Sequence, residues 1–259
     1  MRAKKSLGQH FLHDRSVIER IVANLAPQPE QLLVEIGPGR GALTHPVLRC
    51  GARLHAVEID RELCAALRAT DSSGKLQVHS ADALQFDFGA LATDARPLRL
   101  FGNLPYNIAT ELLFRLLRAA GKIQDMHFMV QKEVAHRLVA GPGGKARGRL
   151  SVMIQISCGV ELLFTVPPGA FSPPPAVDSA VVRLVPHERP ELGTSDASQF
   201  ADLVRLAFQQ RRKTLRNTLR GCLSESAIRD AGVDPGLRAE TLSNAQFVNL
   251  ARQMPGTGQ

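Results

Sequence analysis

The stretch LLVEIGPGRG, residues 32–41, decides the fold of this chain. A run of apolar residues that ends in closely spaced glycines predicts a buried strand, a sharp turn and the start of a helix. The backbone N–H groups of such a turn can approach a ligand closely. Gly37, Gly39 and Gly41 follow a G-x-G-x-G pattern, one residue shorter than the dinucleotide-binding fingerprint. The shorter loop suits a nucleoside without a pyrophosphate, and a purely structural turn is the alternative interpretation.

Strand-like and helix-like segments alternate along the first two thirds of the chain. Short apolar runs predict strands at residues 32–37, 54–59, 76–80, 98–103 and 126–130, and helical periodicity lies between them at 42–51, 61–69 and 110–121. This alternation predicts a mostly parallel sheet with helices on both faces. The later runs 160–166 and 179–185 flank a proline-rich segment with no helix between them, so we expect an antiparallel pair at one edge of the sheet.

The C-terminal part of the chain has a different pattern. Residues 187–196 are polar and turn-rich, which is typical of a linker. Beyond them, residues 197–223 and 245–254 have a purely helical pattern. We therefore expect an α/β domain over residues 1–187 and a small helical domain over residues 188–259, which is too small to be comfortably stable alone and should pack on the first domain.

The composition excludes several classes of protein. The chain has 259 residues, of which 44% are hydrophobic and 22% charged, as in an ordinary globular protein. Its apolar runs fall far short of the roughly eighteen residues that a membrane span needs, so we expect no membrane association. The N-terminus lacks the apolar segment of a signal peptide, which predicts a cytoplasmic protein. The four cysteines lie too far apart for a zinc knuckle, so we expect no metal site.

The net charge of +8 is concentrated in three segments without acidic residues, 1–13, 134–151 and 211–220. We interpret them as a footprint for a polyanion, and solvated helix faces are the alternative. The basic side chains that we single out as contacts are Lys145, Arg147, Arg211, Arg212, Lys213 and Arg216. The remaining basic residues of the three segments are Arg2, Lys4, Lys5, Arg137, Arg149 and Arg220.

Carboxylates follow the second and third predicted strands. Glu58 ends the second strand, where an acid in this type of sheet can accept both hydroxyls of a ribose. Asp60 comes soon after, and we favour Glu58 over Asp60 for this contact. Asp82 follows the third strand and can accept a hydrogen bond from the exocyclic amine of an adenine, with a turn or capping residue as the alternative. Ligands of open α/β sheets bind at these carboxyl ends.

The fourth predicted strand ends in the most specific motif, Asn103-Leu104-Pro105-Tyr106. Proline restricts the residue before it, which holds the Leu104 carbonyl in an extended geometry. The side-chain oxygen of Asn103 and the carbonyl of Leu104 can accept hydrogen bonds from the two N–H groups of an amine conjugated to a ring. The nitrogen of such an amine is a poor nucleophile, and the two acceptors stabilise the positive charge that develops on it during the reaction. Tyr106 can stack on a flipped base. The motif predicts methylation of such an amine, and a proline turn that packs a tyrosine is the alternative.

Taken together, these motifs resemble the ribosomal RNA adenine N6-dimethyltransferase family, in particular its bacterial small-subunit (16S) branch. The segments that carry the resemblance are KKSLGQHFL (4–12), VEIGPGRGALT (34–44), VEID (57–60), DAL (82–84), FGNLPYNI (101–108), QKEVAHRLVAGPGGKARGRLSV (131–152), FSPPPAVDSAVVRL (171–184) and FQQRRKTLRNTLR (208–220). The resemblance implies a Rossmann-like class I S-adenosylmethionine-dependent methyltransferase sheet with a C-terminal helical RNA-binding domain. It also implies transfer of two methyl groups to N6 of each of two adjacent adenosines in the 3′-terminal hairpin loop of 16S rRNA, during small-subunit biogenesis.

The resemblance also assigns roles to individual residues. The cofactor contacts that it implies, with Gly39 added from the glycine loop, are His10, Leu12, Gly37, Gly39, Glu58, Asp82 and Asn103. Relatives often have Asn at the position of His10, and we regard this departure as minor because either side chain can donate a hydrogen bond. Residues 103–106 correspond to the clamp for the target adenine. Phe171 lies where relatives have an aromatic residue that packs against the flipped base, with a packing role in the core as the alternative.

Three other functions remain open at this stage. A nucleotide-dependent oxidoreductase uses a similar glycine loop, but the short glycine spacing and the NLPY motif argue against it. A large-subunit (23S) rRNA adenine methyltransferase shares the loop and the clamp, whereas the segment QRRKTLRN and the length of the helical tail favour the small-subunit branch. A non-catalytic RNA-binding assembly factor can keep the same fold. We expect direct in-line methyl transfer without a metal, by a monomer whose partner is 16S rRNA in the small subunit or its precursor.

Overall fold

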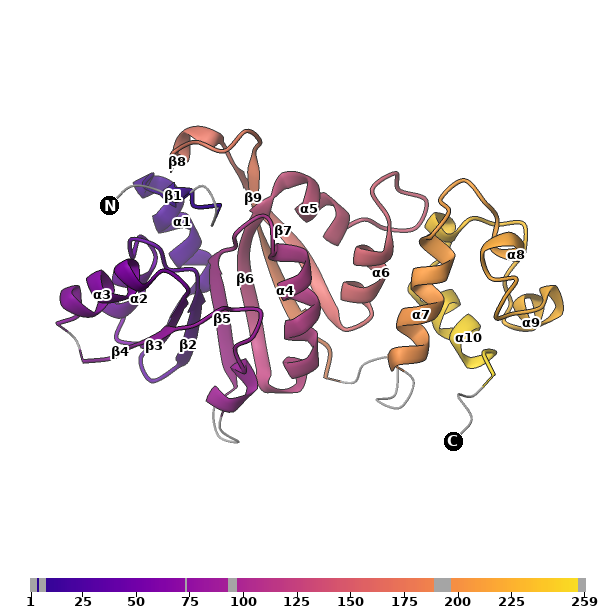
Figure 1. Cartoon of the computed structure of the whole chain (residues 1–259), viewed down its shortest axis with the longest axis horizontal. Helices are drawn as coiled ribbons and strands as arrows, with labels where there is room; N and C mark the ends of the chain where they lie inside the picture. The colour runs from indigo at the N-terminus through magenta and orange to yellow at the C-terminus, as the bar shows by residue number, and fades with distance from the viewer. Residues whose placement is uncertain (1–3, 5–7, 73, 93–96, 189–196, 256–259) are drawn as a thin grey trace. The chain divides into compact units, whose positions relative to one another are not determined.

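The computed structural model describes residues 4, 8–72, 74–92, 97–188 and 197–255 (Figure 1). Its strands are β1 (Phe11–Leu12), β2 (Leu32–Ile36), β3 (Arg53–Glu58), β4 (Leu76–Ser80), β5 (Leu98–Asn103), β6 (Ile123–Gln131), β7 (Cys158–Val166), β8 (Phe171–Ser172) and β9 (Ser179–Pro186). Its α-helices are α1 (Arg15–Leu25), α2 (Thr44–Arg49), α3 (Arg61–Thr70), α4 (Ala109–Leu116), α5 (Lys132–Leu138), α6 (Arg149–Gln155), α7 (Ala197–Phe208), α8 (Leu215–Thr218), α9 (Glu225–Asp230) and α10 (Asn244–Arg252). Short 3₁₀ segments are η2 (Phe88–Leu91), η3 (Leu117–Lys122), η4 (Pro168–Ala170) and η6 (Ala239–Thr241).

Seven of the strands form one sheet in the order β4-β3-β2-β5-β6-β9-β7. The pairs β2 with β3, β2 with β5, β3 with β4 and β5 with β6 are parallel, and β9 runs antiparallel to β6. The mostly parallel sheet with an antiparallel edge is therefore confirmed, and each predicted strand is present. The strand order reverses between β2 and β5, so the carboxyl ends of these two strands meet at the switch point where such sheets bind ligands.

Helices α1 and α3 each start at an aspartate that caps them. Asp14 accepts hydrogen bonds from the backbone of Ser16 and Val17 at the start of α1, and Asp60 accepts one from the backbone of Glu62 at the start of α3. The predicted helical stretches 42–51, 61–69 and 110–121 correspond to α2, α3 and α4 with η3. The sequence analysis did not predict α1, α5, α6 or α9, although Asp14 followed by apolar residues at helical spacing is a start signal for the first of these.

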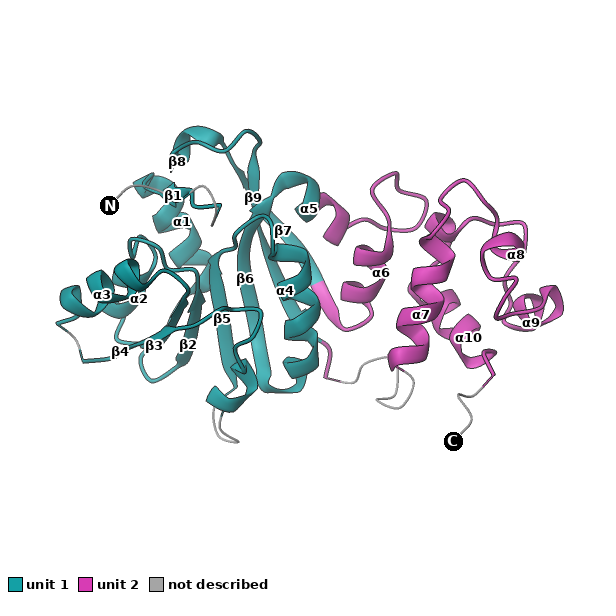
Figure 2. Cartoon of the chain, viewed as in Figure 1, with its two compact units in different colours: residues 1–135, 160–186 teal, residues 136–159, 187–259 magenta. Residues whose placement is uncertain are grey.

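Contacts divide the chain into two compact units, which Figure 2 colours separately. Unit 1 contains residues 1–135 and 160–186, and unit 2 contains residues 136–159 and 187–259. Unit 2 is thus larger than the helical domain expected from the sequence, because it also includes 136–159. The reason lies in packing: Val152 and Ile156 belong to the same buried hydrophobic cluster as Phe200 and Phe247. Of the expected linker, residues 189–196 lie outside the described part of the chain.

The helical tail is interrupted where the sequence predicted a continuous helical pattern. Helix α7 ends at Phe208 and α8 begins at Leu215, and residues 209–213 between them form turns. These intervening residues are all polar or charged, so a helix there has no apolar face to bury. The basic side chains of this segment therefore extend from a turn into solvent. None of the helices in the described ranges is long and apolar enough to cross a membrane.

Candidate active site

The glycine loop after β2 has a backbone that only glycine adopts without strain. Gly37, Gly39 and Gly41 have φ angles of 67°, 56° and 81°, in the left-handed region. A Cβ atom would lie 2.7 Å from the ring of His45 at Gly41 and 3.1 Å from the ring of Phe11 at Gly39. The loop therefore contributes only its glycines, Gly37 and Gly39, to the wall of the cavity that Asn103 and Tyr106 share.

Glu58, at the end of β3, is held by the backbone of the glycine loop. One carboxylate oxygen accepts a hydrogen bond from the N–H of Gly39 at 3.2 Å, and the other accepts one from the N–H of Asp60 at 2.9 Å. Burial raises the pKa of Glu58, while these two backbone hydrogen bonds oppose the rise. Each carboxylate oxygen keeps a free lone pair. The side chain is thus oriented to accept further hydrogen bonds from a ligand hydroxyl.

Asp82, after β4, borders a second cavity of about 170 Å³ on the other side of Glu58. One carboxylate oxygen of Asp82 accepts a hydrogen bond from the N–H of Leu84 at 2.9 Å, and the other from the side chain of Gln85 at 3.3 Å. Aliphatic side chains, including Ile36, form much of the remaining wall. Asp82 therefore shapes its own turn, as the alternative interpretation held, and also faces a mostly apolar space that suits a flat ring.

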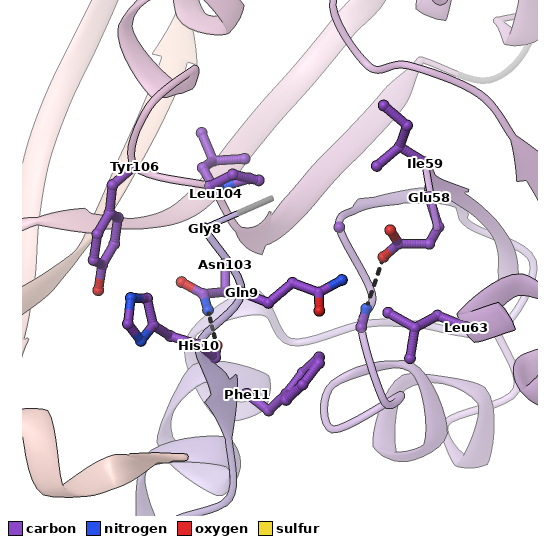
Figure 3. Close-up of a pocket in the computed structure, with 13 residues that line it drawn as sticks. Gly8, Gln9, His10, Phe11, Glu58, Ile59, Leu63, Asn103, Leu104 and Tyr106 are labelled. Atoms are coloured by element: carbon purple, nitrogen blue, oxygen red, sulfur yellow. Dashed lines mark hydrogen bonds between the residues drawn. The ribbon is translucent and has the colours of Figure 1, made fainter. Parts of the chain in front are cut away.

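Asn103, at the end of β5, carries an unused hydrogen-bond acceptor. Its amide nitrogen donates to the carbonyl of His10 at 3.0 Å, which fixes the orientation of the side chain. Its Oδ1 atom is buried and, among the described residues, accepts no hydrogen bond. Buried polar atoms are nearly always paired in folded proteins, and the exceptions often mark functional sites. Because Asn103 lines the cavity in Figure 3, a ligand N–H there would satisfy this oxygen.

Tyr106 and His10 line the same cavity on the side away from Glu58 (Figure 3). The two rings are stacked, with 5.7 Å between centroids and 25° between planes. The Tyr106 hydroxyl is hydrogen-bonded to the hydroxyl of Ser179 at 2.6 Å, and Nδ1 of His10 lies 2.8 Å from the carbonyl oxygen of Pro173. The cavity thus combines an amide acceptor with an aromatic wall, as the NLPY motif predicted.

The structure adds site residues that the sequence analysis missed. Gln9 lines the cavity and donates to Asp60 at 3.2 Å, and Lys4 contacts the same carboxylate at 2.9 Å. Asp60 thus ties the N-terminal segment to the start of α3, whereas Glu58 lines the cavity; the two differ because Asp60 lies beyond the end of β3 as a helix cap, not because of alternation along the strand. Glu35 lines a neighbouring cavity together with Leu12, but its place inside an apolar run gave no functional signal.

The buried carboxyl of Glu35 is mostly protonated at neutral pH. Its pKa is raised to about 8, mainly by burial; a hydrogen bond from the Thr44 hydroxyl at 2.6 Å opposes the rise, and the nearby charge of Glu58 adds to it. The carboxyl group therefore stays neutral until a cationic group approaches or the pH rises.

Two expected RNA contacts need correction. Arg147 is only 1% exposed, because its guanidinium donates to acceptors within unit 2. These acceptors are the carbonyls of Leu242 (3.1 Å) and Ala140 (2.9 Å) and the side chains of Gln155 (3.1 Å) and Asn244 (2.8 Å). Phe171 is 2% exposed and packs in the hydrophobic cluster of Phe101 and Met129, which is the core role that the sequence left open. Neither side chain is presented to an RNA in this structure.

The other expected contacts in unit 2 are exposed. Lys145, Arg211, Arg212, Lys213 and Arg216 all have solvent-accessible side chains. The guanidinium of Arg211 donates to the carbonyl of Lys145 at 2.8 Å, so two of the three basic segments lie side by side. From the first basic segment, Arg2 and Lys5 lie outside the described residues. Among the described residues, no group of three or more His, Cys, Asp or Glu side chains could hold a metal ion.

The residues around the glycine loop fit a nucleoside cofactor. Four features lie around cavities that share Gly37. They are the glycines of the loop, the fixed carboxylate of Glu58, the apolar cavity beside Asp82 and the unpaired acceptor of Asn103. These features match what an adenosine with an amino-acid tail requires: acceptors for its hydroxyls, a flat slot for its ring and an acceptor near its tail.

Comparison with known proteins agrees with this geometry. Residues 1–254 match the family "Ribosomal RNA adenine dimethylase". The chain is 54% identical over 255 residues to the ribosomal RNA small subunit methyltransferase A of Pseudomonas fluorescens, covering 98% of this chain and 94% of that protein. It is 55% identical over 252 residues to the protein of the same name from Xanthomonas campestris pv. campestris strain 8004, covering 96% of this chain and 95% of that protein.

Solved structures show the same fold. A dimethyladenosine transferase from Plasmodium falciparum superimposes with a TM-score of 0.79 at 24% identity, covering 93% of this chain and 96% of that chain. The 23S rRNA methyltransferase ErmE superimposes with a TM-score of 0.72 at 28% identity, covering 94% and 99%. The expected class I methyltransferase fold is thereby confirmed. The chain therefore belongs to the ribosomal RNA adenine dimethylase family, whose members are S-adenosylmethionine-dependent methyltransferases.

Proposed function

We propose that this protein dimethylates N6 of two adjacent adenosines in the 3′-terminal hairpin loop of 16S rRNA, as a step of small-subunit biogenesis. The observation that carries the proposal is the buried Oδ1 atom of Asn103, which faces a cavity with an aromatic wall and has no partner among the described residues. An exocyclic amine of a flipped adenine supplies the N–H that this oxygen lacks. The ring of Tyr106 supplies a surface for the base itself.

The chemistry follows from two acceptors held at one point. Asn103 Oδ1 and the Leu104 carbonyl accept hydrogen bonds from the two N–H groups of the amine. These contacts favour a pyramidal nitrogen and stabilise its developing positive charge. Pro105 stiffens the turn, and the hydrogen bond from Asn103 to the His10 carbonyl keeps the amide from rotating. After the first methylation the amine has one N–H left, so the second transfer relies on one acceptor and the stacking on Tyr106. No strong base is required, because the nitrogen becomes acidic once it is alkylated.

The cofactor contacts come from both sides of the strand switch point. S-adenosylmethionine supplies, when bound, a methyl group activated by a sulfonium. We assign the ribose hydroxyls to Glu58, the adenine to Asp82 and the cavity beside it, and the tail to the region of His10, Leu12 and Asn103. Holding the amine and the cofactor in fixed relation can contribute up to about 7–11 kcal/mol of the rate acceleration in favourable cases.

RNA binding is assigned to the exposed basic surface of unit 2, made of Lys145, Arg211, Arg212, Lys213 and Arg216. Phosphate oxygens are bound by such unobstructed cations, and the contact between Arg211 and the Lys145 carbonyl supports a single binding surface. Arg147 acts from below this surface by holding the loop that carries Lys145. We further propose that the chain works as a monomer in the cytoplasm, where small-subunit precursors are assembled.

We favour the small subunit as the substrate because relatives that share more than half of the residues of this chain are named for it. The proteins at 54% and 55% identity are named for the small subunit, whereas the large-subunit enzyme ErmE is only 28% identical. The test is to incubate the protein with tritiated S-adenosylmethionine and separated subunits from cells that lack the modification. Label in small-subunit rRNA at adjacent adenosines supports the proposal. Label in the large subunit overturns it, and tight binding to small subunits without label indicates a non-catalytic assembly factor.

A further inference from the structure

The hydroxyl group of Tyr106 is anchored far from its place in the chain. It lies 2.6 Å from the hydroxyl of Ser179, the first residue of β9. Ser179 is 0% exposed and pairs in register with Gln131 of β6, so it is fixed by the sheet. For the part of the chain that the structure describes, the Tyr106 hydroxyl is the one recorded partner of the Ser179 side chain. A polar group this deeply buried requires such a partner, so the two hydroxyls depend on each other.

Two contacts determine the plane of the Tyr106 ring. One face is stacked on His10, which is itself held by the carbonyl oxygen of Pro173. The far end of the ring is held by Ser179. Stacking alone allows a ring to slide and tilt, because its energy changes slowly with offset. The hydrogen bond adds the directional restraint, since it weakens steeply when the geometry is lost.

We infer that Ser179 is a positioning residue for the base site, which holds the ring of Tyr106 at the angle that the target adenine stacks on. This inference rests on the proposed function, because it assigns a partner to a ring that the proposal uses. Methyl transfer depends on the placement of the amine relative to the activated methyl, and small displacements of a stacked base are costly in rate. Ser179 does not itself line the cavity that Asn103 and Tyr106 share, so its effect on the reaction passes through Tyr106.

The test is a double-mutant cycle on methyl transfer to small subunits. Ser179→Ala and Tyr106→Phe each remove one hydroxyl, and each is expected to lower kcat/KM for the RNA by about tenfold, as for loss of one well-aligned hydrogen bond. If Ser179 acts through Tyr106, the double variant is no slower than the slower single variant. The affinity for S-adenosylmethionine stays unchanged in all three. Losses that add to about a hundredfold, or a Ser179→Ala variant at the wild-type rate, overturn the inference.

A spectroscopic readout separates positioning from general stability. Tyr106 is the only tyrosine and the chain has no tryptophan, so the tyrosinate absorbance reports this ring alone. Burial raises the pKa of Tyr106, and the hydrogen bond with Ser179 lowers it. Ser179→Ala is therefore expected to shift the titration midpoint further upward in the folded protein. Ser151→Ala is the control, because Ser151 is a similarly buried serine in unit 2 that does not contact Tyr106, and it should leave the midpoint unchanged.

The two proposals can fail separately. If the wild-type protein transfers no label to small subunits, the proposed function is wrong, while a shifted tyrosine titration still reports the contact between the two hydroxyls. If the wild type is active and the cycle is additive, only the positioning role of Ser179 is wrong. Circular dichroism on every variant shows whether it folds. Tyr106→Phe retains the ring, so its kcat/KM still tests the hydrogen bond to Ser179 even when Ser179→Ala is unstable.

Discussion

The two sides of the candidate active site differ in whether their polar side chains already have hydrogen-bond partners. On the side of the glycine loop, the side chains already have partners: Glu58 binds the backbone of Gly39 and Asp60, and Asp82 binds its own turn. On the side of the NLPY motif, Asn103 keeps a buried oxygen without a partner among the described residues. Under the proposed function, the first side binds the cofactor with little rearrangement, and the oxygen of Asn103 gains its missing hydrogen bond from the target amine.

This difference separates binding from turnover. Interactions present before substrate arrives contribute mainly to affinity, and interactions completed on the reacting amine contribute to the rate. Substitutions on the glycine-loop side should therefore raise the dissociation constant of the cofactor. Substitutions on the NLPY side should lower kcat while cofactor binding persists.

The largest expected effect comes from Asn103→Ala. Removal of the amide deletes one of the two acceptors for the amine, and such stabilising groups are worth about 100-fold or more in kcat. Cofactor affinity should be retained in part, because Glu58, Asp82 and the glycine loop remain. Transfer of tritium to small subunits measures the rate, and isothermal titration measures the affinity. Asn24→Ala, which removes an exposed asparagine of α1, is the matched control. Wild-type turnover by Asn103→Ala would falsify the clamp.

Glu58→Gln should have the opposite profile. The amide keeps the size of the side chain but loses the charge, and its nitrogen cannot accept the hydrogen bond from Gly39 or Asp60. Loss of charge-assisted hydrogen bonds should weaken cofactor binding by about ten- to a hundredfold. At saturating cofactor, kcat should stay near the wild-type value. Glu30→Gln, on an exposed glutamate paired with Arg53, controls for loss of one negative charge. A fall in kcat with unchanged cofactor affinity would show that Glu58 acts in turnover, and the proposed difference between the two sides would then be wrong.

Glu35→Gln tests whether the buried carboxyl of Glu35, on the glycine-loop side, is protonated in the folded protein. The pKa of Glu35 rises from an ordinary value of 4.5 to about 8 in the folded state. The folded protein therefore holds a proton that the unfolded chain has lost, so this contribution to stability is fully present below pH 4.5 and is lost as the pH rises through 8. One group changes the free energy of unfolding by at most about 1.4 kcal/mol per pH unit.

The measurement is denaturant unfolding between these two pH values. In the wild type, stability should fall as the pH rises, and Glu35→Gln should flatten the slope while keeping an oxygen that accepts from Thr44. Some slope should remain, because burial also raises the pKa of Glu58. Identical slopes in wild type and variant would show that Glu35 is ionised in the folded state.

Much of the difference between the two sides of the site could be predicted from the sequence, because it depends on patterns between residues that are near one another in the chain. The period of apolar residues predicted the strands and the glycine spacing predicted the loop. The choice of Glu58 over Asp60 does not follow from alternation, because residues two apart share a face of a strand; the two differ because Glu58 ends β3, whereas Asp60 lies beyond it as the cap of α3 and binds Lys4. The unpaired oxygen of Asn103 was implied by the chemistry of the NLPY motif.

The failures concern long-range packing. Arg147 looked like any other basic residue of its segment, but its burial depends on Leu242 and Asn244, which are distant in sequence. Phe171 was equally consistent with the base site and with the core. Nothing in local periodicity decides the burial of Arg147 or of Phe171. The break between α7 and α8 is a different case, because the lack of an apolar face over residues 209–213 is a local signal that the sequence analysis did not use.

The smallest expected effect, on the basic surface of unit 2, tests whether substrate affinity is separate from both sides of the site. Arg212→Gln removes one exposed cation, so the slope of log affinity for RNA against log salt should fall by about 0.7–0.9. Neither cofactor affinity nor kcat at saturating RNA should change, because a phosphate contact positions the substrate without touching the reacting amine. Arg205→Gln, which removes a cation already paired with Asp202 at 3.1 Å, is the matched control and should leave the slope nearly constant. If Arg212→Gln leaves the slope unchanged while its kcat falls, this side chain acts in catalysis, and the division of the molecule into affinity and turnover regions is wrong.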